Sequence, residues 1–156
     1  MKLKTICSGL LALTAMLVPA AGIAQAQGRH PAYLHARSDL RAAQFLMRVR
    51  EEPNVTRNLR MAADEAEAAI GEIDRAAIID HKDIEDHPRV DEGMPRPGRF
   101  RRVMELLREA RADIAREEDN GRSREWRNAA YRHIDQALEH VHRAAVEAHL
   151  DHELGF

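Results

Sequence analysis

Apolar residues recur at spacings of three and four along most of this chain, the pattern of helices that bury one stripe. The first such run begins at Pro31, a residue suited to a first helical turn, and ends before Glu51-Glu52-Pro53. The second extends from about Asn54 to Ile79. The predicted buried positions of these two helices are Tyr33, Ala36, Leu40, Ala43, Met47, Val55, Leu59, Ala62, Ala66, Ala69, Ile73 and Ala76.

The same rhythm predicts two further helices in the second half of the chain. One spans about Arg99 to Glu117, and the other follows Ser123, a candidate N-cap, and continues to about His152. Their predicted buried positions are Phe100, Val103, Leu107, Ala110, Ile114, Ala130, Ile134, Ala137, Val141, Ala144 and Ala148. Four proline and glycine residues between positions 80 and 98 predict a long irregular connection before the third helix.

These four helices predict an all-α fold, because no segment alternates polar and apolar residues in the manner of a strand. Helices of this length with mostly short connections favour an antiparallel up-down-up-down four-helix bundle. We expect that bundle to occupy residues 27–156 as one domain, with residues 80–98 as the long connection between the second and third helices.

The first 26 residues are typical of a secretory signal peptide. Lys2 and Lys4 precede an apolar run from Leu10 to Ala21, and Ala24-Gln25-Ala26 matches a cleavage site. The apolar run is too short to span a bilayer, and no later apolar stretch approaches about 20 residues, so we expect no membrane insertion after cleavage. The leader predicts a bacterial periplasmic or secreted protein, and its removal takes away Cys7, the single cysteine of the chain.

Charge and composition exclude several functional classes. The chain has 24 Lys and Arg residues against 26 Asp and Glu residues, and loss of Lys2 and Lys4 leaves 22 against 26. This acidic balance does not indicate a nucleic-acid partner. Ser38 and Ser123 are the only serines after the leader, and neither lies in a nucleophile motif. We therefore expect a protein that is not an enzyme.

Nine histidines, all of them after the leader, are the one unusual feature of the composition. An up-down-up-down bundle would bring the start of the first helix, the long connection and the end of the fourth helix to one end. The candidate metal ligands at that end are His30, His35, His81, His87, His149 and His152. Imidazole, with Asp83 or Asp86 as oxygen ligands or supporting partners, suits divalent copper, zinc or nickel.

Other interpretations of the histidines remain open at this level. They could be surface residues without a defined site, or they could form a switch near neutral pH. A haem site would pair His35 with His142 or His149 by analogy with cytochrome b562-type bundles. The main alternative function is a metal-independent structural or chaperone-like module that contacts a protein partner through a helix face or through the basic segment 96–102.

The segment His133-Ile134-Asp135-Gln136-Ala137-Leu138-Glu139-His140-Val141-His142 resembles the repeats of small periplasmic metal-binding proteins of the SmbP type. That resemblance implies a secreted four-helix bundle that takes up copper and other divalent metals. The segments His30-Pro31-Ala32-Tyr33-Leu34-His35-Ala36 and Asp86-His87-Pro88-Arg89-Val90-Asp91 are similar to motifs of uncharacterised secreted bacterial four-helix proteins. This second resemblance implies the same fold and no particular activity.

Overall fold

The computed structural model describes residues 31–79, 93–116 and 124–155, and these ranges are helical apart from short turns. They contain no strand, which confirms the predicted all-α class for the part of the chain that is described. The helices are α1 (Pro31–Met47), α2 (Pro53–Ile79), α3 (Arg96–Arg116), α4 (Arg124–Glu147) and the short α5 (Asp151–Leu154). None of them is long and apolar enough to cross a membrane within the ranges described.

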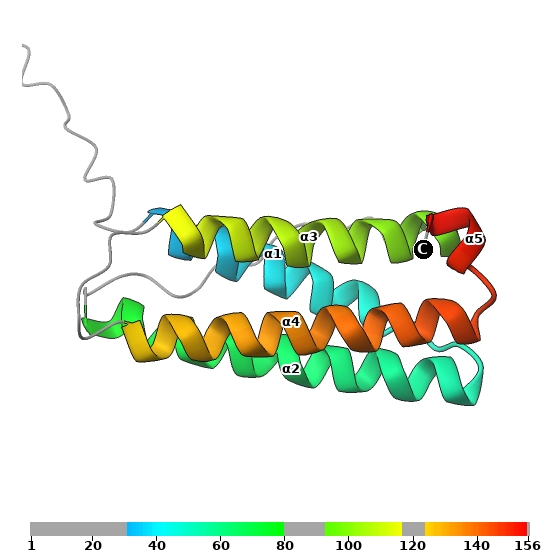
Figure 1. Cartoon of the computed structure of the whole chain (residues 1–156), viewed down its shortest axis with the longest axis horizontal. Coiled ribbons are helices and arrows are strands. Elements are labelled where there is room, and N and C mark those ends of the chain that lie inside the picture. Colours follow the sequence, from blue (N-terminus) through cyan, green and yellow to red (C-terminus); the bar gives the residue numbers. More distant parts are fainter. Residues whose placement is uncertain (1–30, 80–92, 117–123, 156) are drawn as a thin grey trace, which may run out of the picture.

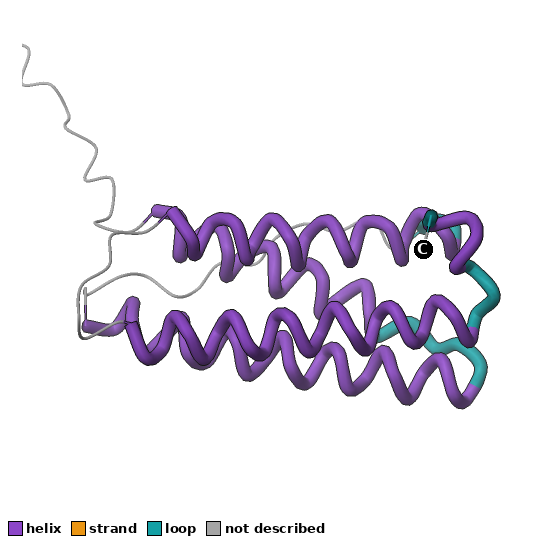
Figure 2. Tube along the Cα trace, in the orientation of Figure 1, coloured by secondary structure: helices purple, strands orange, loops and turns teal. Residues whose placement is uncertain are grey.

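The four long helices lie side by side with their axes roughly aligned (Figures 1 and 2). α1 packs against α2 and α3, and α4 packs against the same two helices, whereas α1 and α4 have no close backbone contact. The predicted stripes are buried, with the exceptions of Ala148, which is partly buried, and Ala76, whose side chain lies outside the described set. The apolar periodicity therefore identified the interior faces of all four helices.

Alanine is frequent on the buried faces of α2 and α4, the two helices with the most extensive contact among the described residues. Ala62, Ala66 and Ala69 on α2 are fully buried, as are Ala137 and Ala144 on α4. Small side chains let two helix backbones approach closely, so this pair is held by many short-range contacts rather than by large apolar groups.

α3 begins at Arg96, four residues before Phe100, the first predicted buried position of this helix. The sequence pattern placed Arg96, Pro97 and Gly98 in the irregular connection, but they form the first turn of α3. Proline is tolerated there because the first turn of a helix needs no donor from its backbone nitrogen. The predicted long connection is thus shorter at its C-terminal end, and residues 80–92 lie outside the described ranges.

The sequence pattern predicted that the fourth helix continues to about His152, but α4 ends at Glu147. His149 has a φ of 57°, the left-handed conformation that commonly terminates helices. Its backbone N–H donates to the carbonyl of Val146, and that of Leu150 donates to the carbonyl of Ala145, which together form a Schellman motif. The buried side chain of Leu150 supplies the apolar contact that accompanies this motif.

The starts of α2 and α3 lie at one end of the molecule, and their C-terminal parts lie at the other. Arg99 in the first turn of α3 forms an ion pair with Glu51, which precedes α2. Ile73 near the end of α2 and Ile114 near the end of α3 line the same hollow. α2 and α3 therefore run in the same direction, and the predicted up-down-up-down order is wrong.

The other two helices run opposite to this pair. Arg37 near the start of α1 contacts Asp74 near the end of α2, and Glu147 at the end of α4 contacts Asn58 near the start of α2. The end of α2 and the start of α3 therefore lie at opposite ends of the molecule. α3 has 21 residues and is about 30 Å long at 1.5 Å per residue.

Candidate functional site

The six histidines proposed as metal ligands do not form one group. His30, His81 and His87 lie outside the described ranges. His35 lies on α1 at the end where α3 terminates, whereas His149 and His152 follow α4 at the opposite end. The expectation that His35 gathers with His149 and His152 is therefore wrong, because it depended on the direction of α3 and α4 relative to α1.

His149 and His152 have exposed side chains on the turn after α4 and on α5. The backbone of His149 terminates α4, which gives this residue a structural role that its spacing did not indicate. Across residues 31–79, 93–116 and 124–155, no three His, Cys, Asp or Glu side chains already converge on a point where a metal ion could bind.

His35 lies in a surface depression of about 330 Å³ between α1 and α3. The residues that line this depression are His35, Ser38 and Asp39 from α1 and Glu109, Asp113 and Arg116 from α3. His35 and Asp39 are four residues apart, as are Glu109 and Asp113, and residues at this spacing share one face of a helix. Two pairs of potential metal ligands thus face each other across the groove between the two helices.

The depression is electrostatically unfavourable for a further negative charge. Burial, followed by repulsion from Glu109 and Asp113, raises the pKa of Asp39 to about 6, although Arg102 and His35 act in the opposite direction. Asp39 would therefore be protonated in a substantial fraction of molecules at mildly acidic pH. A cation that approaches this carboxyl group stabilises its ionised form.

The basic residues near the depression are already committed to other carboxylates. Arg116 contacts Asp113 at 3.2 Å, and Arg102 contacts Glu109 at 3.4 Å. Both ion pairs involve exposed arginine side chains, so each contributes little to stability. Asp39 is left as the carboxyl group of the depression for which no hydrogen bond or ion pair is seen among the described residues.

The basic segment at the start of α3, the alternative interaction surface, is occupied within the molecule. Arg99 forms an ion pair with Glu51, and Arg96 contacts Glu51 at 3.1 Å and also pairs with Glu52. A backbone hydrogen bond and the Arg96 guanidinium lower the pKa of Glu52. These contacts attach the start of α3 to the turn between α1 and α2, and they leave little free positive charge there.

Two more histidines lie along the interface between α2 and α4. The Nδ1 atom of His133 is 2.7 Å from Glu65 Oε2, and the Gln136 amide can also donate to this carboxylate. His140, seven residues further on, has a buried Nδ1 atom without a hydrogen-bond partner. His35 lies near the start of α1, whereas His142 and His149 lie towards and beyond the end of α4, at the other end of the molecule, so the fold does not bring them together as a haem pair.

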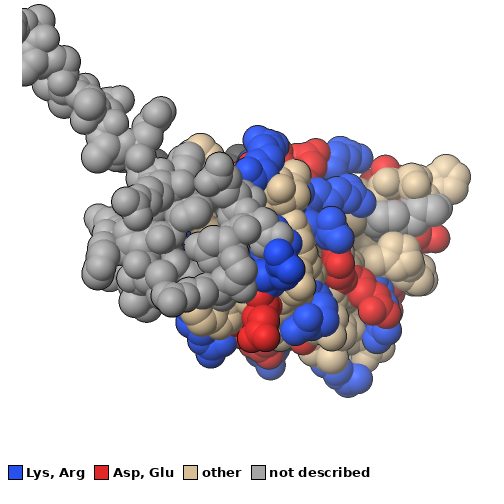
Figure 3. All heavy atoms as spheres, turned by 60° about the vertical axis from the view of Figure 1, so that its left-hand side comes forward, with Lys and Arg blue, Asp and Glu red and all other residues tan. Residues whose placement is uncertain are grey.

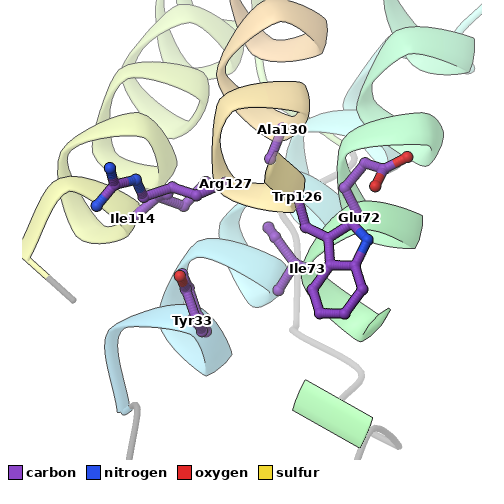
Figure 4. A pocket seen from close by; sticks show the side chains of 7 residues that line it. All are labelled: Tyr33, Glu72, Ile73, Ile114, Trp126, Arg127 and Ala130. Atoms are coloured by element: carbon purple, nitrogen blue, oxygen red, sulfur yellow. The ribbon is translucent and has the colours of Figure 1, made fainter. Parts of the chain in front are cut away.

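A hollow near the start of α4 is a gap between packed side chains rather than a ligand site. Trp126 and Arg127 from α4 meet Tyr33, Glu72, Ile73 and Ile114 there, and the Trp126 indole lies beside Glu72 (Figure 4). The hollow, about 160 Å³ in total and partly open to solvent, contains no position that could hold a water-sized molecule. The hollow therefore offers no room for a substrate or cofactor.

Comparison with known proteins adds no assignment. The chain matches no protein-family model, no curated protein and no solved structure.

Proposed function

We propose that this chain is a secreted or periplasmic, non-enzymatic helical protein that binds or buffers a divalent transition metal. The proposed site is the depression between α1 and α3. The observation that carries the proposal is the pairing of His35 and Asp39 on α1 with Glu109 and Asp113 on α3 around one depression. A ring nitrogen with carboxylate oxygens is a donor set that suits zinc, copper or nickel.

The surrounding fold supports a site between two helices. We propose that the four long helices form a four-helix bundle in which α2 and α3 run parallel, joined by residues 80–95. Bundles commonly build metal sites from side chains on facing helices, and an i, i+4 pair on each helix directs two donors towards the same groove. The sequence contained this spacing for His35 and Asp39, but only the pairing of α1 with α3 supplies the second pair.

Metal binding requires modest rearrangement of the side chains. His35 and Glu109 are exposed, so they can rotate towards Asp39 without disturbing the interior. A bound cation would offset the burial and the repulsion that raise the pKa of Asp39, and it would release the proton held there. The affinity should therefore fall as the pH decreases and Asp39 becomes protonated.

The other predicted ligands are not part of the depression between α1 and α3 as the structure describes it. His30, five residues before His35, and His81 and His87 remain candidate ligands without a described position. His149 and His152 could bind metal only at a separate place, because they lie at the opposite end of the molecule from His35.

The test is a calorimetric titration of the full chain with zinc, copper and nickel at pH 7.5. Every protein in the comparison carries Cys7→Ser, so that a thiol in the leader cannot contribute to binding. We expect a dissociation constant at or below micromolar, corresponding to about −8 kcal/mol. His35→Ala and Asp39→Asn should each weaken binding at least tenfold.

The matched control is His142→Ala, which removes an exposed histidine on α4. It should leave the affinity unchanged. Equal losses from His35→Ala and His142→Ala would indicate diffuse binding by surface histidines and would refute the site. Absence of binding tighter than about millimolar by all three metals would refute the function and favour the metal-independent interaction module.

A further inference from the structure

The corner where α1 ends and α2 begins carries an unbalanced positive charge. Arg48 and Arg50 in the turn and Arg57 and Arg60 in the first turns of α2 are exposed. None of the four has an ion pair or side-chain hydrogen bond with another residue in the described ranges. We call residues 45–61 the α1–α2 corner.

The acidic residues of the same corner do not neutralise these arginines. Glu51 is held by Arg96 and Arg99, and Glu52 is held by Arg96, so both carboxylates are directed towards α3. The next acidic residue along α2 is Asp64, which is exposed and lies one turn beyond Arg60.

Three exposed apolar side chains occur in the same segment as the arginines. Phe45 is 40% exposed, Val49 is 36% exposed and Met61 is 42% exposed, which makes them three of the four large apolar residues most open to solvent in the described part of the chain. Phe45 lies in the last turn of α1, and Val49 lies in the turn that follows, between Arg48 and Arg50. Met61 directly follows Arg60 on α2.

The register of α1 and α2 brings two of the arginines to a shared groove. The Gln44 amide contacts the Ala63 carbonyl at 3.4 Å and Glu67 at 2.7 Å. Arg48 lies four residues after Gln44, directly beyond the end of α1, and Arg60 lies one turn before Ala63 on α2. Two unpaired guanidinium groups thus border the same groove, an arrangement that disfavours the free protein and favours an anionic partner.

The described surface seen in Figure 3 does not show this separation of charge, because basic and acidic side chains are interspersed on it. Several of the remaining arginines have a carboxylate partner, such as Arg111 with Asp135 at 2.7 Å and Arg143 with Glu139. The α1–α2 corner therefore differs from the surrounding surface in both charge balance and apolar exposure.

We propose that the α1–α2 corner is a docking surface for an anionic phospholipid membrane. Lipid phosphates would pair with the four arginines, and Phe45, Val49 and Met61 would enter the boundary between headgroups and acyl chains. A nucleic acid or an acidic peptide would satisfy the arginines but would give the exposed apolar side chains no apolar phase. The inference does not depend on metal binding, because the corner and the α1–α3 depression share no residue.

The test is co-sedimentation of the full chain with vesicles of phosphatidylcholine containing roughly one third phosphatidylglycerol, at low salt. Vesicles of phosphatidylcholine alone measure any binding by the apolar leader, and the difference in partition between the two vesicles is the readout. Each arginine near an anionic surface contributes a factor of about five to the partition coefficient. Arg48→Gln with Arg60→Gln should therefore reduce this difference about 25-fold.

The matched control combines Arg108→Gln and Arg132→Gln, which remove two exposed arginines of α3 and α4. Phe45→Ser tests the apolar contribution against Val146→Ser on α4, which is similarly exposed. Helical circular dichroism spectra identify any variant that fails to fold. Equal losses for the corner and control pairs would overturn the proposal. Equal binding to the two vesicles, or binding to heparin without binding to anionic vesicles, would overturn it as well.

Discussion

Replacement of Asp74 by alanine should destabilise the molecule strongly, because Asp74 is paired with a buried arginine. Arg37 Nε contacts Asp74 Oδ1 at 2.5 Å, and the side chains of the two residues are 2% and 22% exposed. One terminal nitrogen of Arg37, Nη1, is buried without a hydrogen-bond partner. Asp74 is thus the one carboxylate seen to compensate this buried charge.

The expected magnitude follows from the unequal burial of the two partners. Asp74→Ala leaves the Arg37 guanidinium buried and uncompensated, and breaking such a pair costs about 3–5 kcal/mol. Arg37→Met keeps the apolar volume and leaves Asp74 partly solvated, so we expect a loss of about 1–2 kcal/mol. In the Arg37→Met background, Asp74→Ala should then have almost no further effect. The two positions should therefore show strong coupling.

The assay is urea unfolding followed by helical circular dichroism, with Trp126 fluorescence as a second probe because this residue lies at the same end of the molecule. A double-mutant cycle of the two single variants and the double variant gives the coupling energy directly. Our reasoning is refuted if Asp74→Ala costs less than Arg37→Met, or if the coupling is below about 1 kcal/mol, the range of a solvated surface pair.

Three further predictions follow from the structure. In metal-free protein, Asp39→Asn should stabilise the fold at pH 7 and have little effect near pH 4. Folding raises the pKa of the Asp39 carboxyl to about 6, so this group destabilises the fold increasingly as the pH rises from about 4 to 6. Urea titrations that show the same effect of Asp39→Asn at pH 4 and at pH 7 would contradict this. Glu51→Gln should cost about 2 kcal/mol, because Glu51 pairs with the largely buried Arg99. If the urea midpoint of Glu51→Gln is unchanged, solvent compensates the charge of Arg99 and the prediction is wrong. Ala66→Leu should cost about 1–3 kcal/mol by overpacking the interface of α2 and α4, whereas Ala112→Leu on the exposed face of α3 should change the thermal midpoint little; equal shifts would contradict the close packing described above.

The helical segments and their buried faces were predictable because both depend on local spacing. A stripe such as Val55, Leu59, Ala62 and Ala66 repeats every three or four residues, and a helix is the regular structure that places all of these side chains on one side. The end of α4 was not predictable from a glycine, because His149 occupies the left-handed position in its place. Histidine is one of the few other residues enriched in that conformation.

The sequence indicated only one of the two residue pairs of the candidate site. The spacing of His35 and Asp39 was visible along α1, but nothing local indicated that Glu109 and Asp113 would face them. The histidines that looked clustered were separated because α3 and α4 run in the directions opposite to those of an up-down-up-down bundle. The length of residues 80–95 was the available signal, since connections between neighbouring antiparallel helices are usually shorter.

The sequence by itself determined the all-α class, the four long helices and the residues that each helix buries, because a period of 3.6 residues is a property of neighbouring positions. Only the tertiary structure decided the direction of α3. Apolar stripes are nearly symmetric to reversal of a helix, so burial alone barely distinguishes the two directions. The ion pairs of Arg96 and Arg99 with Glu51 and Glu52 do distinguish them, and they form only once residues from distant parts of the chain have met.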